Sequence, residues 1–377
     1  MKDNYDLITT SQAIFDVVKR GNLIEETRVQ YEIKCVGTEI ETSQIGYDTV
    51  KYKFTITKID LLTDKKKSHD FVRRYTHFLW LQNELQNKLI GRIIPSLPEK
   101  QTGYDKDKRK LEFVYFMQKI LSHKKFQSVD CIERFFSEEL KEYEAFQQYI
   151  DNMRESQSVI NKVINTGLSF MNMFQRVYNY NNVQIFPRIP DDLDKQFDEY
   201  RKEFELNKLN TEIITLDLQK IVQKLQTQTR SLSSSFDIFM NECQGTEEFN
   251  MLKIIIKIYE SYEIKLRQKY IYRMEASIKD YDQAIKLINL YKDLKDQINK
   301  DSQLINNQNY KSQIDELQQQ IRINKEKVDQ LNLNFNDDIK IFRQQQSWCL
   351  NDVQQYFQID LKECYDSIKS QKTAEHV

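Results

Sequence analysis

The stretch FVRRYTHFLWLQNEL, at residues 71–85, decides the fold of the first part of the chain. It begins as the apolar end of a strand and places two arginines and a tyrosine, at positions 73–75, where that strand passes into a helix. The helix is predicted because three apolar residues recur at spacings of three and four, namely Phe78, Leu81 and Leu85.

Two further segments carry residues of the same chemistry. PSLPEK at residues 95–100 is a proline-restricted loop, and KDKRKL at residues 106–111 begins a helix that contains Arg109. Arginine suits a phosphorylated ligand because its planar fork binds phosphate oxygens in pairs and stays charged. A tyrosine ring can lie against a sugar or inositol face. The three segments therefore predict a pocket for a phosphorylated ligand.

These segments resemble the phosphoinositide-binding PX domain of the sorting nexins. The resemblance rests on RRYTHF at 73–78, PSLPEK at 95–100 and Arg109 followed by Phe113 and Phe116, and it continues through SHKKF at 122–126 and IERFF at 132–136. It covers roughly residues 25–145. It implies an α+β domain with a three-stranded antiparallel sheet and helices.

The resemblance also implies a role for each residue of the pocket. Arg74 would bind the 3-phosphate of phosphatidylinositol 3-phosphate, and Tyr75 would pack on the inositol ring. Lys100 would meet the 1-phosphate, and Arg109 would hydrogen-bond the ring hydroxyls at positions 4 and 5. The simpler interpretations stay open: an arginine at a helix N-terminus is often an ordinary surface residue, and a tyrosine there is often part of the core.

Two more residues are candidates for a supporting role. Arg73 supports the fold or the general positive charge. Tyr104 is the one large apolar side chain in the short loop between Lys100 and Arg109. In PX domains this loop is usually longer and dips into the bilayer.

Residues upstream of this stretch alternate as strands do. Val29, Tyr31, Ile33 and Cys35 share one face, and Val50, Tyr52, Phe54 and Ile56 share another. The lysines at 65–67 are predicted to form a hairpin tip leading into a strand at 70–75. We expect a flexible N-terminal arm at residues 1–24 and the PX domain at 25–145.

The C-terminal half predicts long helices. After Pro190 the sequence has no proline and one glycine, Gly245, and its apolar residues step by threes and fours. Breaks near residues 243–246 and 306–309 predict three helices at about 191–242, 247–306 and 311–370. Helices of that length form an extended all-α bundle, and wide apolar stripes on such a bundle usually need a partner.

A PX domain followed by three long helices resembles the sorting nexins that carry a BAR domain. The resemblance implies a BAR-like dimerisation domain at residues 191–370, a tail at 371–377, and a homo- or heterodimer with another BAR-type sorting nexin that senses or stabilises curved endosomal membrane in cargo sorting. Residues 146–190 would be a linker, in which an apolar face over residues 156–178 predicts an amphipathic helix.

Charge and composition narrow the function classes. Residues 51–125 hold 18 Lys and Arg against 8 Asp and Glu, although the whole chain has a net charge of −1. A local positive field suits an anionic membrane surface. Nucleic acid is the competing partner, but the basic segment has no recognised nucleic-acid motif. Scattered cysteines favour a reduced intracellular compartment. The resemblance to the sorting nexins implies a cytoplasmic protein that is peripheral on endosomal membranes.

The sequence contains no pattern typical of catalysis. The four histidines have no companions at metal or triad spacing, and no Walker loop or nucleophile elbow occurs. We therefore expect no enzyme activity, no metal and no cofactor. Two alternatives to the membrane-bending dimer remain: a PX adaptor whose bundle is a protein-interaction scaffold, and a coiled-coil scaffold whose PX-like domain has lost lipid binding.

Overall fold

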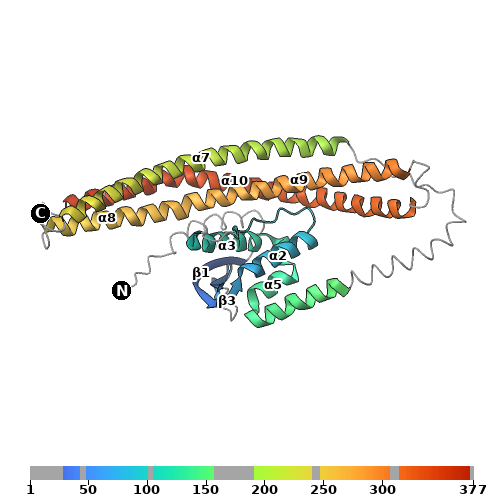
Figure 1. The fold of residues 1–377 in the computed structure, drawn as a ribbon, viewed down its shortest axis with the longest axis horizontal. Coiled ribbons are helices and arrows are strands. Elements are labelled where there is room, and N and C mark those ends of the chain that lie inside the picture. The colour runs from blue at the N-terminus through green and yellow to red at the C-terminus, as the bar shows by residue number, and fades with distance from the viewer. Residues whose placement is uncertain are drawn as a thin grey trace, which may run out of the picture.

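The computed structural model describes residues 29–42, 48–100, 105–156, 191–239, 247–305 and 314–373. An N-terminal domain (residues 29–156) of strands and short helices lies against one side of a bundle of long helices (residues 191–373), as Figure 1 shows. The predicted N-terminal arm, almost all of the predicted amphipathic helix and Tyr104 lie outside the described residues.

The sheet is the antiparallel three-stranded sheet that the sequence predicts. It runs in the order β1 (Val29–Thr42), β2 (Asp48–Asp60) and β3 (Lys66–Arg74). Alternation sends Ile33, Phe54 and Phe71 into the core, because successive side chains of a strand point to opposite faces. The hairpin between β2 and β3 differs from the prediction.

That hairpin turns before the three lysines end. The carboxylate of Asp60 accepts the N–H groups of Leu62 and Thr63, and the N–H of Asp60 donates to the Lys65 carbonyl. This closes the turn at residues 61–65, so Lys66 and Lys67 already pair with β2. An aspartate that binds the backbone two residues on initiates a turn, and this signal outweighs the polarity of the lysines.

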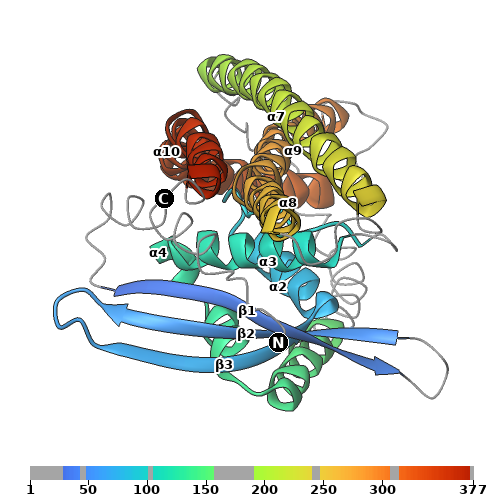
Figure 2. The ribbon, with the colours of Figure 1, turned by 90° about the vertical axis from the view of Figure 1, so that its left-hand side faces the viewer.

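Helices cover one face of the sheet (Figure 2). They are α2 (Tyr75–Lys88), α3 (Lys106–Leu121), α4 (Lys124–Gln127), α5 (Asp130–Ser137) and a helix through residues 140–156. Phe78 of α2 stacks on Phe113 of α3 with ring centroids 3.9 Å apart, and both side chains are fully buried. The RRYTHF stretch is thus anchored on its helical side by the aromatic core.

The bundle consists of three long helical segments. They are α7 (Asp191–Phe239), a second segment made of α8 (Glu247–Leu266), the π-helical turn η1 (Arg267–Ile271) and α9 (Tyr272–Ile305), and finally α10 (Ile314–Thr373). The absence of proline permits such lengths. Among the described residues, no helix combines the length and the apolar character needed to cross a membrane.

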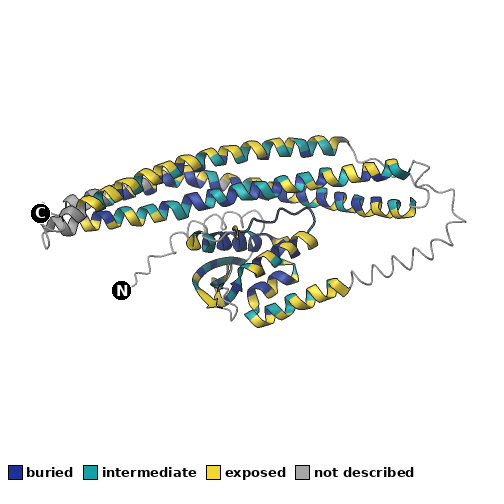
Figure 3. Cartoon of the chain, in the orientation of Figure 1, coloured by how far each residue is buried: buried dark blue, intermediate teal, exposed yellow. Residues whose placement is uncertain are grey.

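α7 has two apolar faces. Phe197, Phe204 and Val222 are buried in the bundle. A second face carries leucines and isoleucine at spacings of three and four that are half exposed: Leu206, Leu209, Ile213 and Leu216. We call these four residues the α7 stripe; Figure 3 shows how buried and exposed residues are distributed along the long helices. Their helical spacing matches a core pattern, but Thr211 and Thr215 occupy the inner face there.

The N-terminal domain and the bundle share hydrophobic cores. Leu111 and Tyr115 of α3 belong to one apolar cluster with the bundle, and Ile93 belongs to another. Gly91 lies where the chain meets α10, with φ +86°, and a Cβ there would collide with the backbone of Leu331. Only glycine fits such a left-handed, close approach. The two parts of the chain therefore form a packed joint.

Candidate functional site

The predicted pocket begins where β3 ends. Arg73 faces the core and Arg74 the opposite side, because the strand alternates up to the first residue of α2. Arg74 is the N-cap of α2, and its own N–H donates to Nδ1 of His77 at 3.2 Å. Helix α2 thus starts at Tyr75 and holds both residues at the positive end of a helix dipole, where anions are favoured.

Tyr75 joins the proline loop to α3. Its hydroxyl donates to the carbonyl of Pro98 at 2.8 Å, and Nη2 of Arg109 donates to the carbonyl of Glu99 at 3.0 Å. The Arg109 guanidinium lies 5.9 Å from the centroid of the Tyr75 ring. Burial raises the pKa of Tyr75, so the ring acts as a neutral surface. The structure therefore brings Tyr75, Arg109 and the loop at 95–100 together.

Arg74 is held by two carboxylates. Its Nη2 lies 3.1 Å from Oε2 of Glu41 on β1, and its Nη1 lies 3.0 Å from Oε1 of Glu144 on the helix through residues 140–156. The Glu41 carboxylate also pairs with Lys51 at 2.9 Å, and this hydrogen bond is the main reason that the pKa of Glu41 is lowered. Sequence reasoning missed both glutamates, which lie far from Arg74 in the chain.

The other predicted site residues have different surroundings. Lys100 is exposed and directly follows Glu99. Arg73 is fully buried: its guanidinium lies 4.4 Å from the centroid of the Tyr143 ring and donates to the carbonyl of Glu138 at 2.8 Å. Arg73 thus supports the fold. The neighbours of Arg109 point elsewhere, since Lys108 pairs with Glu275 and Lys110 with Asp107.

Basic residues on the second helical segment of the bundle pair with carboxylates inside the chain. Lys265 and Lys269 pair with Asp360 of α10, and Arg273 pairs with Asp352. These cations therefore tie the second helical segment to the third.

The chemistry of the site is that of anion binding. Guanidinium groups, an exposed lysine and a neutral aromatic ring can hold a phosphorylated ring by charge-assisted hydrogen bonds and stacking. Within the part of the chain that the structure describes, no group of three or more His, Cys, Asp or Glu side chains is placed to hold a metal ion.

Known proteins share this domain. Residues 61–139 match the model of the PX domain family. Sorting nexin MVP1 of Candida glabrata is 32% identical over 81 residues, which cover 20% of this chain and 16% of that protein. Human sorting nexin-33 is 27% identical over 195 residues, which cover 47% of this chain and 31% of that protein. The chain thus spans less than a third of these relatives.

A solved structure described as the SNX-BAR Mvp1 tetramer aligns with 91% of this chain and 98% of its own, at 15% identity and a TM-score of 0.49. The PX match, the sorting nexin relatives and the sheet-plus-long-helix architecture agree with one another. The chain therefore contains a PX domain similar to those of the sorting nexins, and a bundle of long helices follows it.

Proposed function

We propose that the protein is a peripheral membrane protein that binds phosphatidylinositol 3-phosphate through the pocket of Arg74, Tyr75, Lys100 and Arg109. The observation that supports the proposal is that Tyr75 and Arg109 both bind the loop that ends at Lys100, through the carbonyls of Pro98 and Glu99. The basic charge of residues 51–125 adds attraction to an anionic lipid surface.

The glutamates on Arg74 fit this proposal. Both are partly exposed, and a surface ion pair contributes only about 0–1 kcal/mol. A dianionic phosphate offers the same guanidinium a stronger, bidentate partner. Lipid binding would then replace Glu144, Glu41 or both, and each carboxylate lowers the apparent affinity by competing with the phosphate.

The test is co-sedimentation with vesicles with and without phosphatidylinositol 3-phosphate. Removing a charge-assisted bidentate contact costs roughly 1.5–3 kcal/mol, so Arg74→Ala should weaken binding about tenfold or more. Glu144→Gln should strengthen it about threefold, because an uncharged amide competes less. Arg134→Ala is the matched control: it removes a positive charge from the same domain, at an arginine paired with Glu138. Equal binding by wild type and Arg74→Ala would reject the pocket.

We also propose that the bundle dimerises, with a second copy or another BAR-type sorting nexin, and that the dimer senses or stabilises curved endosomal membrane during cargo sorting. Support comes from the α7 stripe, whose four apolar side chains are each 50–58% exposed. Exposed contiguous apolar surface on a soluble protein commonly marks an interface.

The dimer is tested by sedimentation equilibrium of Ile213→Asp, which should become monomeric. Leu62→Asp is the control, since Leu62 is 72% exposed but lies on a hairpin of the N-terminal domain. A monomeric wild type, or an Ile213→Asp dimer of unchanged affinity, would refute this interface. Electron microscopy of the vesicles then separates the two remaining functions, because tubules indicate membrane bending and smooth vesicles indicate an adaptor that binds proteins through its bundle.

A further inference from the structure

The two walls of the proposed headgroup pocket are each held by the same bundle helix. One wall is the proline loop at residues 95–100, and the other is the N-terminus of α3, which carries Arg109. Figures 1 and 2 show α3 lying directly along the second helical segment of the bundle. Two side chains of α9, eight residues apart and thus on one helical face, contact these walls: Tyr272 and Asp280.

Asp280 binds the proline loop. The residue is 3% exposed, and its Oδ1 accepts both the N–H and the hydroxyl of Ser96, each at 3.0 Å. The other oxygen pairs with Lys119 of α3. Ser96 lies between the two prolines and two residues before the carbonyl that Tyr75 binds. Since the prolines restrict the loop, fixing Ser96 also fixes the neighbouring carbonyls.

Tyr272 binds the cap of α3. Its hydroxyl donates to Oδ2 of Asp105 at 2.8 Å, while Oδ1 of Asp105 accepts the N–H groups of Asp107 and Lys108. The N–H of Arg109 donates to the Asp105 carbonyl at 3.0 Å. Asp105 is therefore held from both domains, and Arg109 lies one turn after it.

Tyr272 faces α3 just after the π-helical turn η1, where the helix is packed on two sides. A π-turn inserts one residue into a helix and shifts the register of the residues after it. Tyr270, Ile271 and Tyr272 are all buried, because the bundle covers one face of this helix and the N-terminal domain covers the other. Tyr270 binds Asp360 of the bundle, whereas Tyr272 binds the N-terminal domain. The hydroxyl of Tyr115 donates to the Gln268 carbonyl within this turn, at 3.2 Å.

From this geometry we infer that Asp280 and Tyr272 are positioning residues of the headgroup pocket, so that the bundle sets the spacing between the proline loop and Arg109. The inference rests on the proposed function. It makes the affinity of the pocket for an inositol phosphate a property of the full chain, and it links any change at η1 to lipid binding.

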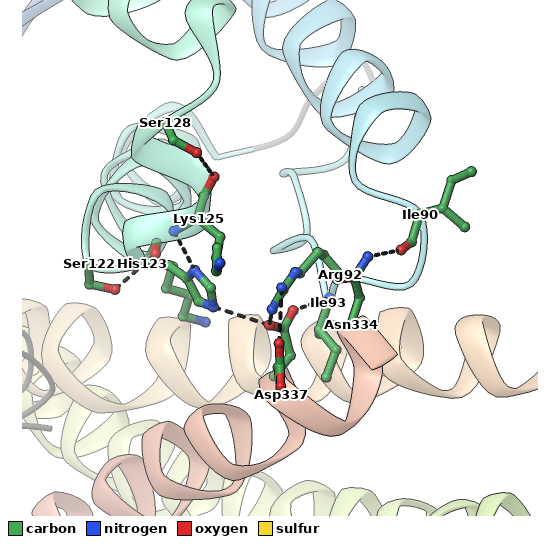
Figure 4. Close-up of polar contacts among 11 residues, drawn as sticks. Ile90, Arg92, Ile93, Ser122, His123, Lys125, Ser128, Asn334 and Asp337 are labelled. Atoms are coloured by element: carbon green, nitrogen blue, oxygen red, sulfur yellow. Dashed lines mark hydrogen bonds and ion pairs between the residues drawn. The ribbon is translucent and has the colours of Figure 1, made fainter. Parts of the chain in front are cut away.

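A matched control exists in the same joint. Asp338 of α10 is also buried and also accepts a loop N–H, that of Ile93 at 2.9 Å. Its Oδ1 pairs with Arg92 and lies 3.1 Å from Nε2 of His123. Figure 4 labels Arg92, Ile93 and His123 at this joint. None of these partners belongs to the proposed pocket. Loss of Asp338 should therefore loosen the joint without altering the pocket directly.

The experiment is calorimetric titration of the full chain with inositol 1,3-bisphosphate, the soluble headgroup, alongside thermal unfolding of each variant. We expect Asp280→Asn and Tyr272→Phe to weaken binding about fivefold or more, as coupled sites do, and Asp338→Asn to leave the affinity within twofold of wild type. Combining Tyr272→Phe with Arg109→Ala should reduce the binding free energy by less than the sum of the two single losses, since both changes act through Arg109.

The outcomes separate the two proposals. If wild type does not bind the headgroup, the proposed function fails and the positioning role fails with it. If wild type binds and Arg74→Ala does not, but Tyr272→Phe binds like wild type, the pocket stands and the positioning role is wrong. Equal losses for Asp280→Asn and Asp338→Asn would also overturn it, because docking in general would then be the cause. Tyr272→Phe keeps the test valid should Asp280→Asn not fold.

Discussion

Arg73 and Arg74 are neighbours of identical chemistry with opposite surroundings. Arg73 is fully buried, and its guanidinium donates to the carbonyls of Val72 at 2.7 Å and Glu138 at 2.8 Å. Arg74 is partly exposed and faces two carboxylates. The alternation of β3 alone separates them.

The difference shows which arginine can exchange its partners. The backbone carbonyls around Arg73 are fixed in the core, so its N–H groups are used in hydrogen bonds that hold the fold. The carboxylates on Arg74 are anions at the solvent edge, and a phosphate can take their place. Burial lowers the pKa of Arg73 to about 10, which still leaves it charged at neutral pH. One Arg-Arg pair thus serves both the core and the proposed ligand.

The largest effect expected from this comparison is on stability. Arg73→Met should lower the free energy of unfolding by about 2–4 kcal/mol, because it leaves the Glu138 carbonyl without its donor and removes a cation that lies on the Tyr143 ring. Arg74→Met, the matched control, should cost about 1 kcal/mol or less, since its pairs are partly exposed. Urea unfolding followed by circular dichroism measures both.

If the two methionine variants lost equal stability, the division of roles between these arginines would be wrong. A stable Arg73→Met protein that no longer bound vesicles would reverse the assignment, and would make Arg73 the ligand-binding residue. The same two variants in the sedimentation assay therefore complete the comparison.

Much of this region could be predicted from the sequence. Period-two alternation and the spacing of Phe78, Leu81 and Leu85 predict the strand-to-helix junction, and the structure has it. The role of Arg74 came from a family resemblance and stays a proposal. Its contacts with Glu41 and Glu144 could not be predicted, because pairs of residues far apart in the chain leave no periodic signal in a single sequence.

The bundle, too, could be predicted only in part from the sequence. Absence of proline predicts long helices, and the structure contains them. Apolar spacing does not tell an inner face from the α7 stripe, since both step by three and four. The π-turn was also not predicted, because an extra residue in a helix shifts the register without a characteristic residue type.

A smaller effect, on the pH dependence of folding stability, is expected from His77. It lies one turn after Arg74, accepts the Arg74 N–H with Nδ1, and turns Nε2 toward Glu144 at 3.4 Å. Burial first, and then the charges of Arg73 and Arg74, lower the pKa of His77 to about 4. Its usual value is about 6.5. Between these values the unfolded chain binds more protons than the folded chain, so stability falls as pH drops.

The expected loss from this histidine is about 2 kcal/mol between pH 8 and pH 5. Protonation also removes the acceptor for the Arg74 N–H, so the N-terminus of α2 should loosen at the proposed pocket. Urea unfolding of wild type and His77→Gln at both pH values isolates the contribution, because other groups titrate alike in the two proteins. The pH dependence should be weaker in the variant by this amount. If the two proteins lost stability in parallel, His77 would be protonated in the fold and the helix start would tolerate that charge.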